Sequence, residues 1–332
     1  MILRNKKYIL FTFIILILTV IFIFSFHNTK RINTESLVNI KTPQDLNQMI
    51  EERSSWKDVL KETDNYKFYE YLKKSYANNY NQHSVGHIFG EILFDKEGFV
   101  GVVVCDDAFF WGCHHGFVSW ALVDGGEENI HKLFEGCKKM NENEYQQCIH
   151  GIGHGLIGLF GSSGLTKSLN ICDSLDGNES CYTGVFMEYN FPTVSKKGIF
   201  VQEVRTLGNN IYYPCQRFIG GHAKSCYYEL PRLWERVFKS DFQKIGNACE
   251  NINSAEYKRD CYRGVGEVTS LTTDHDLDKT IDLCSKMPSE MGKNICLISS
   301  ALGFANTPNK KDQVDDICKL VDNSYKTECP KN

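Results

Sequence analysis

Histidines are the residues of this chain whose spacing points most directly to chemistry. His83 and His87 stand four residues apart, and so do His150 and His154. On a helix, that spacing places two imidazoles on one face, where both can bind the same metal ion. Imidazole ligands suit zinc, copper or iron. The sequence therefore predicts a transition-metal site to which each pair contributes.

Further candidates come from repeats of the segment that contains the second pair. The segment Cys148-Ile-His-Gly-Ile-Gly-His-Gly has related copies that begin at Cys113, Cys181 and Cys261. Equivalent positions of stacked repeats line one surface, so polar residues at or near these positions should converge. The additional candidates are His115 and His222 as metal ligands, and Glu188 and Glu267 as catalytic acid or base groups.

Two other interpretations of the histidines stay open. They can act as hydrogen-bonding residues at helix starts and between repeats, or they can line a metal-free groove that binds a peptide or a partner protein. Neither the His-Glu-x-x-His motif of zinc proteases nor the Cys-x-x-Cys-His motif of covalent haem occurs. Close convergence of four or more histidine and glutamate side chains would favour a metal, and a wide groove with scattered tyrosine and arginine would favour a binding scaffold.

The elements that position these residues are organised by cysteines. All 14 cysteines follow residue 100, and the two members of each successive pair stand 8 to 12 residues apart. The pairs are Cys105/Cys113, Cys137/Cys148, Cys172/Cys181, Cys215/Cys226, Cys249/Cys261, Cys284/Cys296 and Cys318/Cys329. Because each connector is short and flanked by helix ends, we expect the two cysteines of each pair to form a disulfide, although other connectivities are possible for such a set.

The step from pair to pair indicates a helical repeat. Four of the six steps between first cysteines are 34 or 35 residues, which is the length of one helix-turn-helix unit. Residues 166–172, 241–249 and 279–284 have apolar side chains three and four apart, so each first cysteine should end a helix and each second cysteine should begin the next. A glycine three residues after four of the second cysteines indicates close approach of two helix backbones. We predict an all-α fold of about seven disulfide-stapled helical hairpins, stacked as a solenoid or curled into a closed toroid.

This organisation resembles the secreted cysteine-rich tetratricopeptide-like (Sel-type) repeat proteins. In those proteins, successive helical hairpins are stapled by regularly spaced disulfides, and the resemblance covers residues 100–329 as architecture. The repeated segment is also similar to one found in membrane-anchored bacterial and archaeal proteins. The resemblance implies a helical repeat fold and no particular activity.

The N-terminal residues predict a membrane anchor. Tyr8–Phe26 is 19 residues without a charge, long enough to cross a hydrocarbon core of about 30 Å, and basic residues flank it on both sides. The expected organisation is a cytoplasmic stub and transmembrane signal anchor at 1–27, a polar spacer at 28–55 and an extracytoplasmic repeat domain at 56–332. Outside the cytoplasm, paired cysteines form disulfides.

These observations lead to one leading function and one rival. The leading function is a membrane-anchored extracytoplasmic repeat protein that binds a transition metal through its histidines, as a metal-dependent hydrolase or oxidoreductase. The rival is a non-catalytic scaffold that binds a peptide or a protein. A net charge of −4 without a basic block predicts no nucleic-acid partner.

Overall fold

The computed structural model describes residues 46–76, 82–176, 178–192, 204–307 and 309–330. These residues form helices and no strands, which confirms the predicted all-α class. The chain divides into two compact units, Met1–Ala77 and Asn78–Asn332. None of the described helices is long and apolar enough to cross a membrane. The predicted anchor, Tyr8–Phe26, lies outside the described residues.

The first unit contains a helical hairpin held by aromatic side chains. Its helices are α3 (Leu46–Glu62), which begins within the range predicted as spacer, and α4 (Asn65–Tyr76). Trp56 of α3 packs edge-on against Phe68 and Tyr76 of α4, with ring centroids 6.1 and 6.2 Å apart. Because all three side chains are fully buried, these contacts account for the pairing of the two helices.

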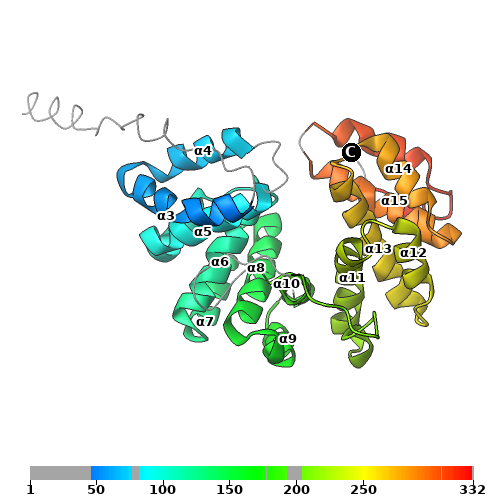
Figure 1. Cartoon of the computed structure of the whole chain (residues 1–332), viewed down its shortest axis with the longest axis horizontal. Coiled ribbons are helices and arrows are strands. Elements are labelled where there is room, and N and C mark those ends of the chain that lie inside the picture. Colours follow the sequence, from blue (N-terminus) through cyan, green and yellow to red (C-terminus); the bar gives the residue numbers. More distant parts are fainter. Residues whose placement is uncertain (1–45, 77–81, 177, 193–203, 308, 331–332) are drawn as a thin grey trace, which may run out of the picture. The chain divides into compact units, whose positions relative to one another are not determined.

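The second unit is built on seven longer helices, each of which contacts the next (Figure 1). We call them the central helices: α5 (Gln82–Glu97), α6 (Gly112–Gly125), α8 (Glu142–Phe160), α10 (Asn178–Asn190), α11 (Gly220–Val237), α13 (Ala255–Thr272) and α15 (Glu290–Ala305). They are buried on most sides, and in α5 every residue from Ser84 to Phe94 is buried. A helix that is apolar or small all round belongs in the interior.

Shorter helices flank the central ones along the chain. They are α7 (Glu128–Cys137), α9 (Leu165–Cys172), α12 (Phe242–Glu250), α14 (Leu277–Ser285) and α16 (Val314–Lys319), and short 3-10 turns occur at Gly98–Val104, Ser162–Gly164, Cys215–Arg217, Lys311–Gln313 and Lys326–Glu328. Each flanking helix buries one face only. In α7 the buried residues are Asn129, Leu133, Phe134 and Cys137, one stripe of an amphipathic helix.

All seven disulfides join the cysteines predicted from their spacing. Their Cα–Cα distances are 5.3–6.0 Å, and the described part of the chain has no free cysteine. Cys113 lies at the start of α6 as predicted, but four second cysteines lie deeper, at the seventh residue of their helices: Cys148, Cys226, Cys261 and Cys296. Four disulfides hold a flanking helix alongside the central helix that follows it, as Cys284 at the end of α14 and Cys296 of α15 do.

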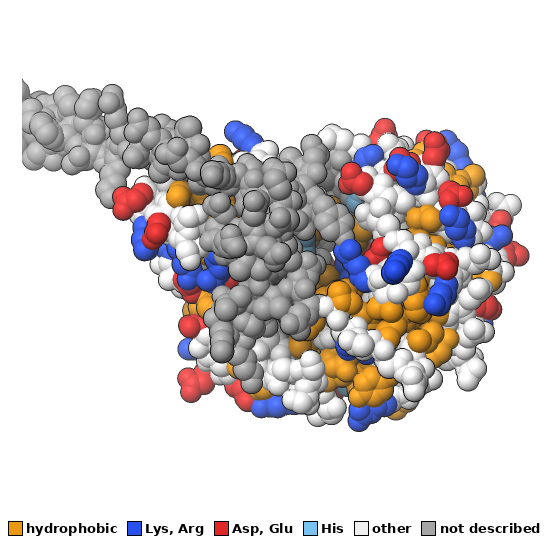
Figure 2. Space-filling view, viewed as in Figure 1, with side chains coloured by type: hydrophobic (Ala, Val, Ile, Leu, Met, Phe, Trp, Pro, Cys, Tyr) orange, Lys and Arg blue, Asp and Glu red, His pale blue; other side chains and the backbone are white. Residues whose placement is uncertain are grey.

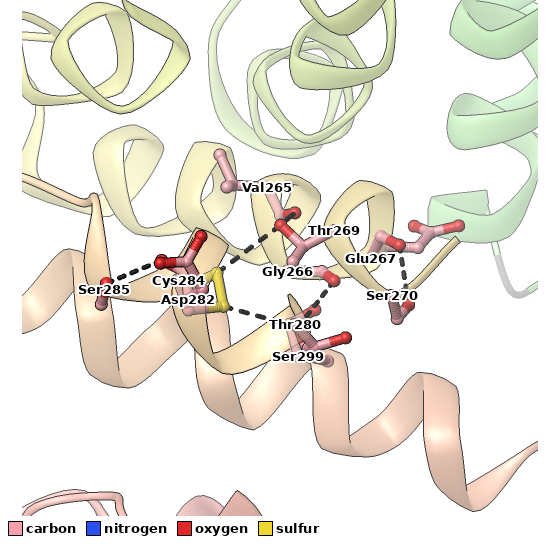
Figure 3. The surroundings of a disulfide bond; sticks show 12 residues. Val265, Gly266, Glu267, Thr269, Ser270, Thr280, Asp282, Cys284, Ser285 and Ser299 are labelled. Carbon is pink, nitrogen blue, oxygen red and sulfur yellow. Dashed lines mark hydrogen bonds between the residues drawn. A yellow bond between two sulfur atoms is a disulfide. The ribbon is translucent and has the colours of Figure 1, made fainter. Parts of the chain in front are cut away.

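Hydroxyl groups complete the packing around this disulfide (Figure 3). Thr269 Oγ1 donates to the Val265 carbonyl at 2.8 Å and lies 3.8 Å from Cys296 Sγ. Ser300 Oγ of α15 donates to the Gly266 carbonyl of α13 at 2.9 Å. Burying a hydroxyl group without a hydrogen-bond partner costs free energy. Because these hydroxyl groups have partners, serine and threonine can pack where two central helices lie close together.

Connector residues begin the helices. Five N-terminal residues accept a hydrogen bond from a backbone N–H in the first turn: Asn141, Asp241, Ser254, Asp276 and Ser289. Each such cap contributes about 1 kcal/mol of helix stability. Asn141, Ser254 and Ser289 lie in the connectors between paired cysteines, and Asp241 and Asp276 lie in the connectors between successive pairs.

Surface charge contributes little to this arrangement. Acidic and basic side chains are interspersed on the face shown in Figure 2. Many pair along a single helix, as Lys138 does with Glu135 at 3.0 Å and Lys286 with Asp282 at 2.9 Å. Exposed pairs of this kind are worth about 0–1 kcal/mol each. Stability therefore depends chiefly on the buried central helices and the disulfides.

Glycine allows the central helices to touch backbone to backbone. A Cβ atom at Gly116 would lie 2.0 Å from the His87 carbonyl oxygen, and one at Gly184 would lie 2.0 Å from that of His150. At Gly264 it would lie 2.0 Å from the Tyr228 carbonyl oxygen. These three are among the glycines that follow a second cysteine by three residues, so the predicted close approach is found at each of them.

We expect Gly184→Ala to destabilise the protein by about 1–3 kcal/mol, because helices α8 and α10 must separate to admit the methyl group. Gly136→Ala is the matched control, since Gly136 lies within α7 and a Cβ there meets nothing within 4 Å. The control should be neutral or stabilising by about 0.5–1 kcal/mol. Chemical denaturation of both variants measures the difference, and equal stabilities would contradict the role of the contact.

Candidate metal centre

Five histidines from three successive central helices come together. His83 and His87 lie on α5, His115 on α6, and His150 and His154 on α8. The ring centroids of His87 and His154 are 5.8 Å apart, so the two predicted pairs meet. His115 lies between the pairs, 5.4 Å from His83 and 4.9 Å from His150. The convergence expected of a metal site is therefore present.

The ligand atoms fall into two groups that share one residue. His83, His87 and His115 each offer a nitrogen within 4.8 Å of the others, and so do His115, His150 and His154. Three imidazole nitrogens at such separations can surround one metal ion after small rotations of the side chains. Either group alone can therefore form a site.

Burial lowers the pKa of four of these imidazoles. His87, His115 and His154 expose 1, 4 and 1% of their surface. Burial lowers the pKa of His83 from 6.5 to about 4. It lowers the pKa of His87, His115 and His150 well below the usual range, and repulsion between the neighbouring imidazolium charges lowers each further. At neutral pH the lone pairs of these four rings are therefore available to a metal.

Hydrogen bonds fix which ring nitrogen carries the proton. His83 Nδ1 lies 2.9 Å from the Phe109 carbonyl oxygen, which can only accept. His154 Nδ1 lies 2.8 Å from a carboxylate oxygen of Glu188. His150 Nδ1 lies 3.0 Å from Thr183 Oγ1, whose proton is donated to the Ser180 carbonyl. In all three histidines Nδ1 is the donor, and in the neutral rings of His83 and His150 Nε2 carries a lone pair.

Within the α8 pair, the two Nε2 atoms face each other. His150 Nε2 and His154 Nε2 are 3.0 Å apart. Burial lowers the pKa of His150 well below its usual range, so its Nε2 presents a lone pair toward His154. In the α5 pair, His83 Nε2 and His87 Nε2 are 3.1 Å apart.

The chain next to the α5 pair has an unusual backbone. Phe109, Phe110 and Trp111 all have left-handed backbone angles, with φ of 58°, 52° and 63°. This conformation costs roughly 1–2 kcal/mol per residue for side chains other than glycine. The Cys105–Cys113 disulfide closes a loop that contains this segment. The Phe109 carbonyl oxygen accepts a hydrogen bond from His83 Nδ1. Strain held in place beside a cluster of ligands is typical of functional sites.

Three residues predicted for the site lie outside both ligand groups. Glu188 is fully buried and accepts a hydrogen bond from His154 Nδ1, so it is placed to orient this ligand. Glu267 accepts hydrogen bonds from Arg232 and Tyr228 instead. His222 binds Asp173 at 2.7 Å and packs on Tyr182, outside both ligand groups. Equivalent positions in the repeat did not bring Glu267 and His222 into the ligand groups, because side chains of neighbouring helices and connectors are their partners.

Sequence reasoning missed the residues that orient the ligands. Thr183 stands two residues after Cys181, the position that His150 occupies after Cys148, so the repeat alignment contained a signal for it. Gln147, whose Oε1 lies 3.1 Å from His115 Nε2, and the Phe109 carbonyl had no such signal. Their contacts arise between helices.

A second buried polar cluster lies on α11 and α13. Arg232 Nη2 donates to Glu267 at 2.6 Å, and its Nε lies 3.5 Å from Glu229. Burial raises the pKa of Glu229 to about 8, a shift that Arg232 opposes and Glu267 increases. The charge of Arg232 also contributes to the lowered pKa of His83 and of His150. This cluster therefore lies within electrostatic range of the histidines.

Comparison with models of known families, with curated protein sequences and with solved structures finds no match for this chain. The interpretation of the site rests on its geometry.

We expect the metal-free protein to lose stability as the pH falls from about 6.5 to about 4. Because the pKa of His83 is lower in the folded protein than in the unfolded chain, the unfolded chain binds more protons in this range and unfolding becomes easier. Thermal unfolding at a series of pH values measures the effect, with His83→Gln as the matched variant. The variant should show a weaker pH dependence, and identical slopes would contradict the assignment of a neutral buried imidazole.

Proposed function

We propose that this protein is a membrane-anchored, extracytoplasmic helical-repeat protein that binds a transition metal through His83, His87, His115, His150 and His154. The site is of the all-imidazole kind, for which zinc, copper and iron are suitable ions. The convergence of five histidines favours this function over the rival scaffold that binds a peptide or a protein.

The observation that carries the proposal is the contact between His150 and His154. Their Nε2 atoms are 3.0 Å apart while both Nδ1 atoms are committed as donors. Burial lowers the pKa of His150 well below its usual value, so its Nε2 presents a lone pair toward His154. A metal ion between the two nitrogens would be bound by both rings. Metal-binding histidines commonly donate their other nitrogen to a carboxylate or a carbonyl, as His154 and His83 do here.

The proposed architecture is a curled array of repeats. The central helices contact one another in chain order. Phe110, which precedes α6, stacks on His275, which follows α13, with ring centroids 6.3 Å apart. Contact between an early and a late repeat supports a closed toroid over an extended solenoid. Such curvature also accounts for the influence of Arg232 on the early histidines.

The proposed location follows from the disulfides and the N-terminal sequence. Seven disulfides fit an oxidising compartment outside the cytoplasm. The apolar stretch at 8–26 supplies the proposed anchor, and a Sel-type arrangement of stapled hairpins agrees with both.

A bound transition metal would supply Lewis acidity or redox chemistry to a substrate, as a hydrolase or an oxidoreductase requires. The residues of the chain would hold the ion, exclude water through burial and keep the ligands neutral. Glu229, with a pKa of about 8, is a buried carboxyl group that can hold a proton at neutral pH near this site.

Metal content of the purified full chain tests the proposal. We expect zinc, copper or iron to remain after dialysis, and we expect His150→Ala combined with His154→Ala to reduce the bound metal strongly, since a pair of ligands is lost. His131→Ala is the control, because His131 is exposed on α7 and belongs to neither ligand group. Elemental analysis of the three proteins measures the result. A wild-type chain that binds none of these metals would refute the function.

Glu188→Gln tests the supporting role of the carboxylate. The substitution keeps an oxygen that can accept from His154 Nδ1 but removes the negative charge, so we expect metal affinity to fall by about 10–100-fold. Glu128→Gln, at an exposed position on α7, should leave affinity unchanged. Competition with a chelator of known affinity measures both, and equal affinities would show that Glu188 does not support the metal.

A further inference from the structure

We infer that the cluster holds two metal ions, one at each histidine pair, with His115 as a ligand common to both. This inference rests on the proposed metal-binding function and specifies how many ions the site takes and how they are linked.

The grouping of ligand atoms argues against a single ion. The described residues contain two sets of three ligand atoms that lie within 4.8 Å of one another. Neither set combines a histidine of the α5 pair with a histidine of the α8 pair. His83 and His87 occur only in the first set, and His150 and His154 only in the second. One ion bound by the α5 pair would therefore leave the α8 pair without a cation.

The geometry within each pair fits one ion per pair. The Nε2 atoms are 3.1 Å apart in the α5 pair and 3.0 Å apart in the α8 pair. With metal–nitrogen bonds of roughly 2.0–2.1 Å, such separations correspond to angles of roughly 90–100° at the metal. Two nitrogens of one pair can thus bind the same ion with little movement, and each ion then needs a third ligand.

His115 is placed to be that third ligand twice. Its ring centroid lies 5.4 and 5.7 Å from those of the α5 pair, and 4.9 and 5.5 Å from those of the α8 pair. Its Nδ1 is buried and makes no hydrogen bond to any residue in the described part of the chain. Its Nε2 faces only the side chain of Gln147.

An imidazole binds two ions as imidazolate, with one ring nitrogen on each ion. Binding of the second ion then displaces the ring proton of His115 to solvent, and the ring stays bound through both nitrogens. No oxidation or reduction is involved. Two positive ions favour this loss of a proton, because they stabilise the anionic ring that lies between them.

The repeat explains why two equivalent half-sites arise. His83 and His87 are related to His150 and His154 by the same spacing on two central helices, and α6 lies between those helices in the chain. In each pair, the first histidine donates Nδ1–H to a neighbouring segment, to the Phe109 carbonyl in one and to Thr183 in the other. The two halves are therefore built alike around His115.

Titration of the metal-free full chain with Cu²⁺ tests the inference. We expect two ions per chain for the wild type and one for each of two double variants, His83→Gln/His87→Gln and His150→Gln/His154→Gln. Retention of one ion by each variant also shows that it has folded. A wild type that binds a single ion, lost in both double variants, would overturn the two-ion inference and leave the proposed function intact. A wild type that binds no ion would overturn both.

Electron paramagnetic resonance of the Cu²⁺-loaded protein tests the common ligand. Two Cu²⁺ ions bridged by His115 should be magnetically coupled, with a signal well below that of two isolated spins, and His115→Ala should restore uncoupled spins or release copper from both half-sites. His131→Ala should leave the coupling unchanged. A full two-spin signal in the wild type would show that the ions are not bridged, and so would an unchanged coupling in His115→Ala.

Discussion

Close contact between helix backbones is the constraint on which this structure depends. Gly116, Gly184 and Gly264 leave room for the carbonyl groups of the preceding central helix, at positions where a methyl group would overlap them. Because these helices touch at their backbones, side chains one turn away on neighbouring helices must also meet. His87, His115 and His150 lie beside such contacts, and the cluster of imidazoles follows from them. Disulfides then hold four of the flanking helices, α7, α9, α12 and α14, against the central helix that follows each of them.

The same contacts determine the electrostatics of the cluster. Five imidazoles gathered in the interior cannot all be protonated, since each charge would be desolvated and would repel its neighbours. The lowered pKa of His83, His87, His115 and His150 expresses that cost. The neutral rings of His83 and His150 donate Nδ1–H to neighbouring oxygens and retain a lone pair on Nε2, which suits them to a metal.

Charge elsewhere in the second unit is compensated locally. Arg232 is paired with Glu267 and lies beside Glu229, whose raised pKa reflects burial. Removing one member of such a group would leave an unpaired buried charge, which is strongly destabilising. The repeats thus use equivalent positions for different chemistry. The early central helices carry imidazoles there, and α11 and α13 carry an ion-paired network.

Local rules of spacing were enough to predict much of this protein from its sequence. Short connectors flanked by helix ends favoured a bond between neighbouring cysteines, and the pairing Cys137–Cys148 and the other six agree with that prediction. Four-residue spacing placed His150 and His154 on one face, because the helix turns every 3.6 residues. Which faces meet is not a local property. It depends on how successive helices cross one another. In the folded chain, His87 lies next to His154 although α6 separates their helices in the sequence. Glu267 and His222 contact other partners. The Nδ1 partners of His83, His150 and His154 also come from other helices or loops, so only the folded chain shows which side chains orient these imidazoles.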